Sequence, residues 1–237
     1  MAINYYPLIN KIVSTLGIKD RLLQEIPEDH FFARPFITIA REPGSGGLPI
    51  AQELGKRLGM AVHDETIIDK VAESTKRRRS IIRKIDEKSR TYLEDLIHSA
   101  LNPNYVDENT YIKELSKVIL LLAHDGNNII VGRGANFITP FSKGLHVNIV
   151  APYKLRVLRA MKHEDYTEEK AKQVIAHHEK ERRDFVKRYF KQDLNSRNAY
   201  DLTLNTTHYS IEEAAEVIEM AFRRKFPAWQ RIKSALF

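Results

Sequence analysis

The small residues Gly44-Ser45-Gly46-Gly47 follow the apolar, β-branched stretch 36–40, and apolar residues at helical spacing come after them. A buried strand, a glycine-rich turn and a helix start together favour an anion site. Backbone N–H groups point inward there, glycine lets a phosphate approach them, and the helix dipole adds positive charge. A turn that only reverses the chain is the alternative, and these four residues alone do not decide between the two.

The turn lacks two groups that most phosphate loops carry. In the pattern G-x-x-x-x-G-K-[ST], a lysine reaches the β- and γ-phosphates and a hydroxyl binds Mg²⁺. Here Gly46 is followed by Gly47, Leu48 and Pro49. If the loop serves phosphoryl transfer, another cation must replace the lysine, and planar guanidinium groups suit phosphate oxygens. The candidate catalytic cations are Arg41, Arg182 and Arg188. The alternatives are an ion pair beside the sheet for the first and solvated helix charges for the other two.

Charged residues follow or open other predicted strands. Arg133, flanked by glycines after the apolar run 128–131, has little packing role there, and we expect it to be functional. Asp64 would bind an acceptor or hold Mg²⁺ through water, although a helix N-cap explains it equally well. Asp201 opens a strand, where aspartate is unfavourable, so it predicts a specific partner, with a structural arginine as one choice.

The elements that must position these residues alternate between strands and helices. Strands are predicted at residues 36–40, 60–63, 128–131, 146–150 and 201–204. Helices are predicted from Pro49 to Gly59, along 112–125, from Pro152, from Thr167 towards Phe190, and from Ser210, which forms a capping box with Glu213. This alternation predicts the α/β class, with a mainly parallel sheet covered on both faces. Ligands of such sheets bind beyond the carboxyl ends of the strands.

The composition bounds the function classes. The 237 residues, 43% hydrophobic and 29% charged, are typical of a globular protein, and the absence of cysteine excludes disulfides, thiolate metal sites and a catalytic thiol. No apolar run approaches the roughly 18 residues of a membrane helix, and the first ten residues lack a secretory pattern, so we expect a cytoplasmic protein. The net charge of +7 favours anionic partners without choosing among them.

Two other features argue against nucleic-acid and zinc chemistry. The basic run 76–84 lacks interleaved aromatic residues and is followed by acidic ones, so a solvated helix is favoured over a nucleic-acid surface. The nine histidines are scattered and no H-E-x-x-H motif occurs, so we expect no zinc or other metal site built from protein ligands alone. The sequence leaves a homo-oligomer open.

Four segments, in order, resemble the cytidylate kinase-like family, in which an R-E-x-G-S-G-G loop replaces the standard phosphate loop. They are residues 37–47, 130–134 (similar to the G-R-D segment of cytidylate kinases), 151–159 and 200–206. The resemblance covers about residues 36–222 and implies a P-loop kinase-like three-layer fold with a helical insertion and a lid. It also implies ATP and Mg²⁺, with transfer of the γ-phosphate to a nucleoside monophosphate or a similar small acceptor.

The same resemblance suggests roles for individual residues. Gly44, Ser45, Gly46 and Gly47 would cradle donor phosphates. On the acceptor side, Arg133 would contact the nucleotide and Asp201 would lie near its sugar; Asp64 is an acceptor-binding candidate from its position after a strand, not from the resemblance. Arg182 and Arg188 are the candidate lid arginines. Gly134 and Leu48 replace an aspartate and an arginine of the family pattern, so cytidine specificity is not carried over.

The expected organisation is a helical extension over 1–35, a kinase-like domain over 36–226 and a tail over 227–237. Within the domain, 65–126 would be an acceptor-binding helical insertion and 165–195 the lid. Three other functions stay open: a nucleotide-binding or sensor protein with weak or no catalysis, a kinase for a different small acceptor, and an RNA-binding module that uses the positive charge.

Overall fold

The structure is a computed structural model that describes residues 32, 34–66, 68–69, 87–101 and 110–229. Its strands are β1 (Phe36–Arg41), β2 (Ala61–His63), β3 (Asn128–Val131), β4 (Gly144–Val150) and β5 (Leu202–Asn205). Its helices are α3 (Gly47–Leu58), α6 (Glu87–Ala100), α8 (Thr110–Asp125), α9 (Ala135–Ile138), α10 (Tyr153–Glu164), α11 (Glu168–Phe190) and α12 (Ile211–Lys225). Two short 3-10 turns, η1 (Arg197–Ala199) and η2 (Thr206–His208), flank β5.

The strands form one parallel sheet in the order β2-β3-β1-β4-β5. β1 lies at its centre, and its side chains alternate between two apolar clusters because successive residues of a strand point to opposite faces. Phe36 is buried on the face of α6 and α8, whereas Ile37 and Ile39 are buried on the face of α3 and α12. This arrangement confirms the predicted α/β class and the mainly parallel five-stranded sheet.

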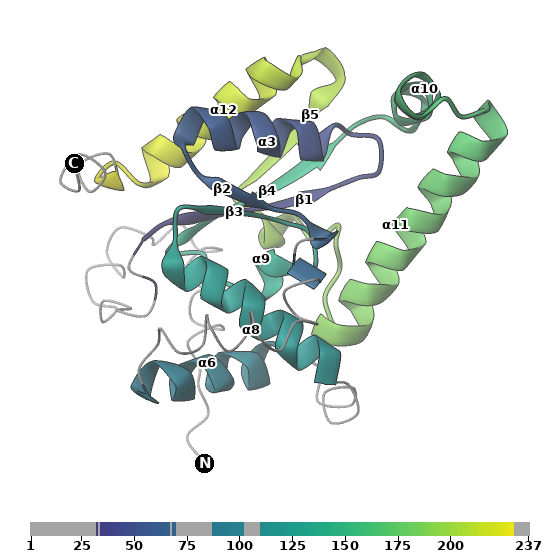
Figure 1. Ribbon diagram of the computed structural model, residues 1–237. Helices are drawn as coiled ribbons and strands as arrows, with labels where there is room; N and C mark the ends of the chain where they lie inside the picture. The colour runs from purple at the N-terminus through teal and green to yellow at the C-terminus, as the bar shows by residue number, and fades with distance from the viewer. Residues whose placement is uncertain (1–31, 33, 67, 70–86, 102–109, 230–237) are drawn as a thin grey trace.

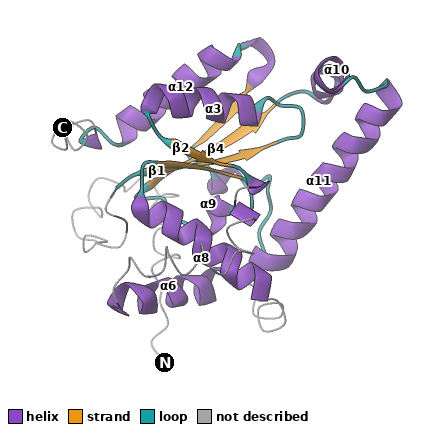
Figure 2. Cartoon of the chain, in the orientation of Figure 1, coloured by secondary structure: helices purple, strands orange, loops and turns teal. Residues whose placement is uncertain are grey.

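Helices cover both faces of the sheet, which gives three layers. α3 and α12 lie together on one face, and α6, α8 and α9 lie on the other (Figure 1). The long α11 runs beside the sheet, away from α10 and towards the lower helical layer (Figure 2). Its last turns join that layer, where Val186 and Phe190 are buried in the same apolar cluster as residues of α6 and α8.

The predicted helix boundaries are confirmed by their caps. Gly59 ends α3 with a left-handed backbone, φ 63°. The Thr167 hydroxyl accepts a hydrogen bond from the Lys170 amide at the start of α11, at 3.3 Å. Ser210 and Glu213 form the predicted capping box of α12.

Several details differ from the predictions. β1 extends one residue further, to Arg41, and β2 begins one residue later, at Ala61. β4 begins at Gly144 rather than at residue 146, because this glycine lies against the Phe36 ring, where a Cβ would clash. β5 is Leu202–Asn205, one residue later than predicted, since the Asp201 carboxylate instead accepts a hydrogen bond from the His146 amide at 2.9 Å. The four-residue α9 was not predicted, because so short a segment carries no helical periodicity.

Some sequence predictions lie outside the described residues: the helical extension over 1–35, of which only residues 32, 34 and 35 are described, and the basic run 76–84. Among the residues that are described, no helix is long and apolar enough to span a membrane. Near the carboxyl end of the described chain, Trp229 is buried against Phe222, and its indole donates to Asn127 Oδ1 at 2.7 Å. Trp229 thus packs on the same apolar cluster as α3 and α12.

Candidate functional site

The glycine-rich loop joins the end of β1 to the start of α3. Gly44 and Gly46 both have a left-handed backbone, with φ 77° and 87°, a conformation that glycine adopts without strain. Gly46 is the N-cap of α3, and this helix start has neither a side-chain cap nor an acidic residue in its first turn. The first amides of a helix have no acceptor within the helix. The amides of Gly47 and Leu48 are therefore suited to an anion.

Ser45 belongs to this loop through its backbone alone. Its side chain is buried, and its hydroxyl donates to the Glu42 carbonyl oxygen at 2.8 Å. The expectation that Ser45 cradles phosphate therefore does not extend to its hydroxyl, which is used inside the loop.

The carbonyl groups of the loop are held from α10 and η2. Arg156 donates to the Pro43 carbonyl oxygen at 3.3 Å, and Arg159 donates to that of Ser45 at 3.3 Å. The Thr206 hydroxyl donates to the same Ser45 carbonyl oxygen at 2.9 Å. Sequence reasoning gave the two arginines no role. The sequence feature that could have identified Arg156 and Arg159 is their spacing of three on a predicted helix that starts at the carboxyl end of a strand.

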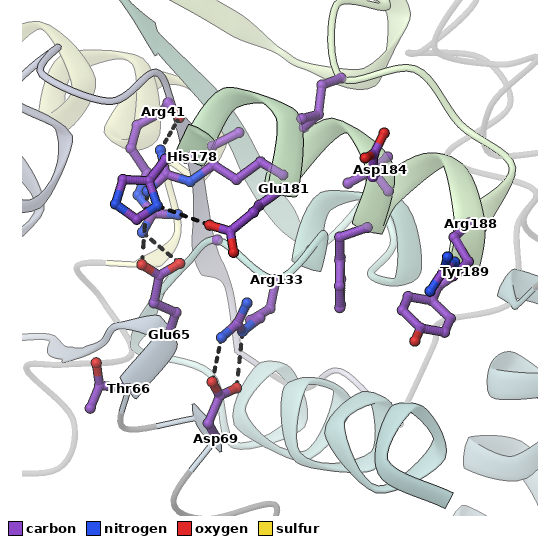
Figure 3. Close-up of a pocket in the computed structure, with 16 residues that line it drawn as sticks. Arg41, Glu65, Thr66, Asp69, Arg133, His178, Glu181, Asp184, Arg188 and Tyr189 are labelled. Atoms are coloured by element: carbon purple, nitrogen blue, oxygen red, sulfur yellow. Dashed lines mark hydrogen bonds and ion pairs between the residues drawn. The ribbon is translucent and has the colours of Figure 1, made fainter. Parts of the chain in front are cut away.

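A cavity of about 760 Å³ lies next to the loop, between α11, the ends of β1 and β3, and the residues after β2 (Figure 3). Guanidinium and carboxylate groups face each other across it. Its lining comprises Ala40, Arg41, Glu65, Thr66, Asp69, Gly132, Arg133, His178, Glu181, Arg182, Asp184, Phe185, Val186, Arg188, Tyr189 and Leu194. The structure thus brings together four of the predicted residues, Arg41, Arg133, Arg182 and Arg188, on one cavity.

Arg41 lies at the border between loop and cavity. Its side chain is 10% exposed and forms an ion pair with Glu65 at 3.0 Å. The stem of Arg41 packs against Gly47, where an added Cβ would lie 2.5 Å from Arg41 Cβ. Its guanidinium packs against Gly132, which also leaves no room for a Cβ. Two glycines from different loops therefore fix the path of this side chain.

Arg182, on α11, lies close to the same Glu65 carboxylate. It donates to the Arg41 carbonyl oxygen at 3.1 Å, and its Nη2 lies 3.8 Å from Glu65 Oε1. Burial, together with the like charge of Arg41, lowers the pKa of Arg182 from its ordinary value to about 10, so it remains charged at neutral pH. Burial alone would raise the pKa of Glu65, but attraction by Arg41 and Arg182 outweighs it and holds this pKa below the usual 4.5.

Arg133 lies just after β3, next to Gly132, and also lines the cavity. Its backbone is left-handed, φ 52°, which is uncommon for a residue with a side chain. Its guanidinium binds both carboxylate oxygens of Asp69, through Nε at 2.9 Å and through Nη2, and lies 5.7 Å from the centre of the Phe185 ring. Burial opposes the charge of Arg133, but the hydrogen bonds to Asp69 raise its pKa above the ordinary value.

The other predicted residues lie apart from this group. Arg188 lines the cavity near Tyr189, away from the Arg41 ion pair (Figure 3). Asp64 precedes helical residues 65–66, its carbonyl oxygen accepts from the Ile68 amide at 3.0 Å, and it is not among the described lining residues. Asp201 lies where β5 begins, at the opposite end of that strand, and binds Lys225 Nζ at 2.6 Å. The placement of Asp201 in an acceptor site is therefore corrected: its partner is a structural lysine.

Glu65 and Asp69 were not predicted as site residues. Their signal was their spacing of four directly after a strand, which places two carboxylates on one face of a helical segment. Without the fold, nothing in the sequence connected Glu65 to Arg41 and Arg182, 24 and 117 positions away, or Asp69 to Arg133, 64 positions away.

The residues present fit a nucleotide better than a protein-held magnesium ion. At Gly46 an added Cβ would make only an ordinary van der Waals contact, 3.6 Å from Ile50 Cδ1, so no described protein atom crowds the start of α3. In contrast, Leu48 and Pro49 replace the usual magnesium-binding hydroxyl. Within the described parts of the chain, no group of three or more His, Asp or Glu side chains is arranged to hold a metal ion.

Comparison with known proteins agrees with this geometry. Cytidylate kinase of Pyrococcus horikoshii is 25% identical over 186 residues, which cover 78% of this chain and 86% of that protein. Uronate isomerase of Corynebacterium glutamicum is 24% identical over 129 residues, or 54% of this chain, which spans only 25% of the isomerase. The crystal structure of an uncharacterized protein from Eubacterium ventriosum superposes with a TM-score of 0.61 at 20% identity, over 79% of this chain and 97% of that one, and shows a shared fold.

The family match includes the glycine-rich loop, the cavity residues and the arginines of α10. A sequence model of the cytidylate kinase-like family matches residues 36–208, from the first residue of β1 to the last residue of η2. With the parallel sheet and the loop between β1 and α3, this match identifies the architecture as P-loop kinase-like. The chain belongs to the cytidylate kinase-like family.

Proposed function

We propose that this protein is a phosphotransferase that moves the γ-phosphate of ATP to a nucleoside monophosphate or a similar small acceptor. Family membership supports the reaction class. The glycine-rich loop supports a phosphate-binding donor site, and the neighbouring cavity of about 760 Å³ has the size of a small-molecule site.

The position of Arg41 is the observation that carries the proposal. Its stem packs against Gly47 at the start of α3, and its guanidinium lies beside Gly132 on the cavity wall. A phosphoryl group that passes from the loop to an acceptor in the cavity would pass this guanidinium. Arg41 would thus supply the positive charge that the lysine of other phosphate loops provides.

Phosphoryl transfer asks little covalent chemistry of the protein. An acceptor oxygen attacks the γ-phosphorus, the bond to the β–γ bridging oxygen breaks, and ADP leaves with that oxygen. The protein must align the reactants and stabilise the charge on the transferring group. In this proposal the amides of Gly47 and Leu48 hold the donor, Arg41 and Arg182 stabilise the transferring group, and Arg133 binds the acceptor. Mg²⁺ would be held by phosphate oxygens and water.

A nucleotide-binding protein without transfer is the second candidate. Two observations favour it: Leu48 stands where a cation would reach the phosphates, and three cavity arginines already hold carboxylates. On this alternative the loop binds a nucleotide, but the internal ion pairs persist and no phosphoryl group moves.

Turnover with a panel of acceptors separates the two candidates. ATP and Mg²⁺ are incubated with each nucleoside monophosphate, and the products are separated by anion-exchange chromatography. The proposal expects turnover with at least one acceptor and, for Arg182→Ala, a kcat lower by about tenfold or more. Arg183→Ala removes an adjacent exposed charge that does not line the cavity and should leave kcat unchanged. ATP binding without any turnover supports the second candidate, and neither binding nor turnover overturns both.

A further inference from the structure

Arg156 of α10 connects three parts of the molecule. Its Nη1 donates to the Pro43 carbonyl oxygen at 3.3 Å and to Glu179 Oε1 at 2.6 Å. Its Nε donates to the Ala151 carbonyl oxygen at 2.9 Å and lies 3.4 Å from Glu42 Oε2. One guanidinium therefore contacts the glycine-rich loop, the chain just beyond β4, and α11.

The Arg156 side chain is buried, with 6% of its surface exposed. A buried cation is tolerated only when its charge is paired and its donors are satisfied. Here the donors are directed at protein oxygens of Pro43, Ala151 and Glu179. Arg156 is therefore not placed to bind a phosphate directly, and any role in catalysis must act through the groups that it holds.

Glu179 transmits this contact to the cavity. It lies three residues before Arg182 on α11, and residues at that spacing share a helix face. Arg182 donates to the Arg41 carbonyl oxygen at 3.1 Å, at the end of β1. Two neighbouring contacts, Glu179–Arg156 and Arg182–Arg41, thus fasten α11 to the edge of the sheet where the loop begins.

We propose that the Arg156–Glu179 ion pair is a positioning device that fixes α11 relative to the glycine-rich loop and so keeps the Arg182 guanidinium over the cavity. Its effect on catalysis rests on the proposed phosphotransferase function, whereas its effect on the position of α11 does not. Arg156 and Glu179 are positioning residues on this proposal, since neither would touch the transferring phosphate.

Spin-label distance measurements test the positional claim without any substrate. The natural chain has no cysteine, so two labels can be placed cleanly at Gln52→Cys on α3 and Lys180→Cys on α11, both exposed positions. Glu179→Gln keeps the size of the side chain and removes its charge. Glu168→Gln is the matched control, because it breaks the exposed Glu168–Lys172 pair on the same helix.

We expect Glu179→Gln to broaden or shift the distance distribution between α3 and α11, and Glu168→Gln to leave it unchanged. An unchanged distribution in Glu179→Gln overturns the proposal, whatever the enzyme does. A similar change in both variants also overturns it, because the effect would then belong to the helix surface rather than to this ion pair.

Kinetics test the catalytic consequence. A displacement of about 1 Å in an aligned group can lower the rate by roughly 100-fold. We therefore expect Glu179→Gln to lower kcat by about 10- to 100-fold with little change in the KM for ATP. Arg156→Lys keeps the positive charge and should lower kcat by less. If kcat fell in each variant only in proportion to its loss of thermal stability, the ion pair would have a merely structural role and the proposal would be overturned. Absence of turnover in the wild-type protein would overturn the proposed function instead, and the distance measurement would still decide the positional claim.

Discussion

The loop and the cavity hold their polar groups in opposite ways. On the loop side, Arg156, Arg159 and Thr206 bind backbone carbonyl oxygens. The amides at the start of α3 have no side-chain cap. On the cavity side the cations themselves are occupied, because Glu65 pairs with two arginines and Asp69 with a third.

The loop is therefore preorganised for an anion, whereas an anion in the cavity must compete with internal carboxylates for the guanidinium groups. Donors that are fixed before a ligand arrives need no rearrangement, so the loop can bind a phosphate tail at little cost. A ligand anion in the cavity must instead replace Glu65 or Asp69 at its guanidinium. We infer that the loop determines whether a phosphate chain binds and that the cavity determines which acceptor does.

Arg41 lies at the border between the loop and the cavity, and its replacement should have the largest effect on kcat. A guanidinium at the transferring group is worth about 10³- to 10⁵-fold in rate in related chemistry. We expect Arg41→Ala to lower kcat by about 10³-fold, with Arg41→Lys intermediate because a single ammonium lacks the planar fork. Steady-state kinetics with saturating ATP and acceptor measure it. A kcat within about threefold of wild type, in a variant that remains folded, would remove Arg41 from the proposed mechanism.

Alanine at two loop glycines separates backbone strain from a steric clash. At Gly44 a Cβ would lie 2.8 Å from the Arg156 carbonyl oxygen, whereas at Gly46 the nearest atom is 3.6 Å away. Both positions have positive φ, which costs alanine about 1–2 kcal/mol. We expect Gly46→Ala to lose about that much free energy of unfolding, and Gly44→Ala to lose more and to bind ATP about 100-fold more weakly. Urea denaturation and calorimetry measure the two quantities; equal effects in both variants would contradict the contact between the loop and α10.

Much of the fold could be predicted because its signals are local. Four-residue apolar runs bounded by glycine or charge, such as 128–131, indicate buried strands, and Thr167 and Ser210 indicate helix starts from their own side chains. Arg41 and Arg133 were found because each directly follows a strand, and strand ends of a parallel sheet meet at one edge.

The rest depends on contacts between distant parts of the chain. Glu65 and Asp69 became site residues only when the sheet order brought β2 beside β3, the strand that Arg133 follows. Asp201 was misplaced because its unfavourable position in a strand predicts a partner but not the identity of that partner. The structure supplies His146 and Lys225, which lie 55 and 24 positions away.

Replacing Arg133 tests the acceptor side alone. In the structure it binds Asp69 through two guanidinium nitrogens, lies 5.7 Å from the centre of the Phe185 ring and lines the cavity. Because charge-assisted hydrogen bonds contribute about 1.5–3 kcal/mol, we expect Arg133→Ala to raise the acceptor KM by about 10- to 100-fold. The dissociation constant of ATP, measured by calorimetry, should stay unchanged. A weaker ATP affinity with an unchanged acceptor KM would reverse the assignment of the two regions.

Glu65→Gln should have the smallest effect, and its pH dependence has a definite sign. The pKa of Glu65 is lower in the folded protein than its ordinary value, so its contribution to stability is present above the unfolded pKa and disappears as the pH falls through the folded one. The side chain is 35% exposed and solvent screens the pair, so we expect a loss below about 1 kcal/mol at pH 7 and none in acid. Urea denaturation at both pH values measures it.

The same variant tests whether Glu65 competes with the ligand. Without the carboxylate charge, Arg41 and Arg182 lose an internal partner, so the acceptor KM should fall severalfold while the affinity for ATP stays the same. Glu53→Gln on α3, which breaks only the Glu53–Lys56 pair, is the control and should change neither quantity. A higher acceptor KM in Glu65→Gln would mean that the carboxylate orients the two guanidiniums rather than blocks them. The cavity would then be preorganised in the same sense as the loop, and the contrast between the two regions would be wrong.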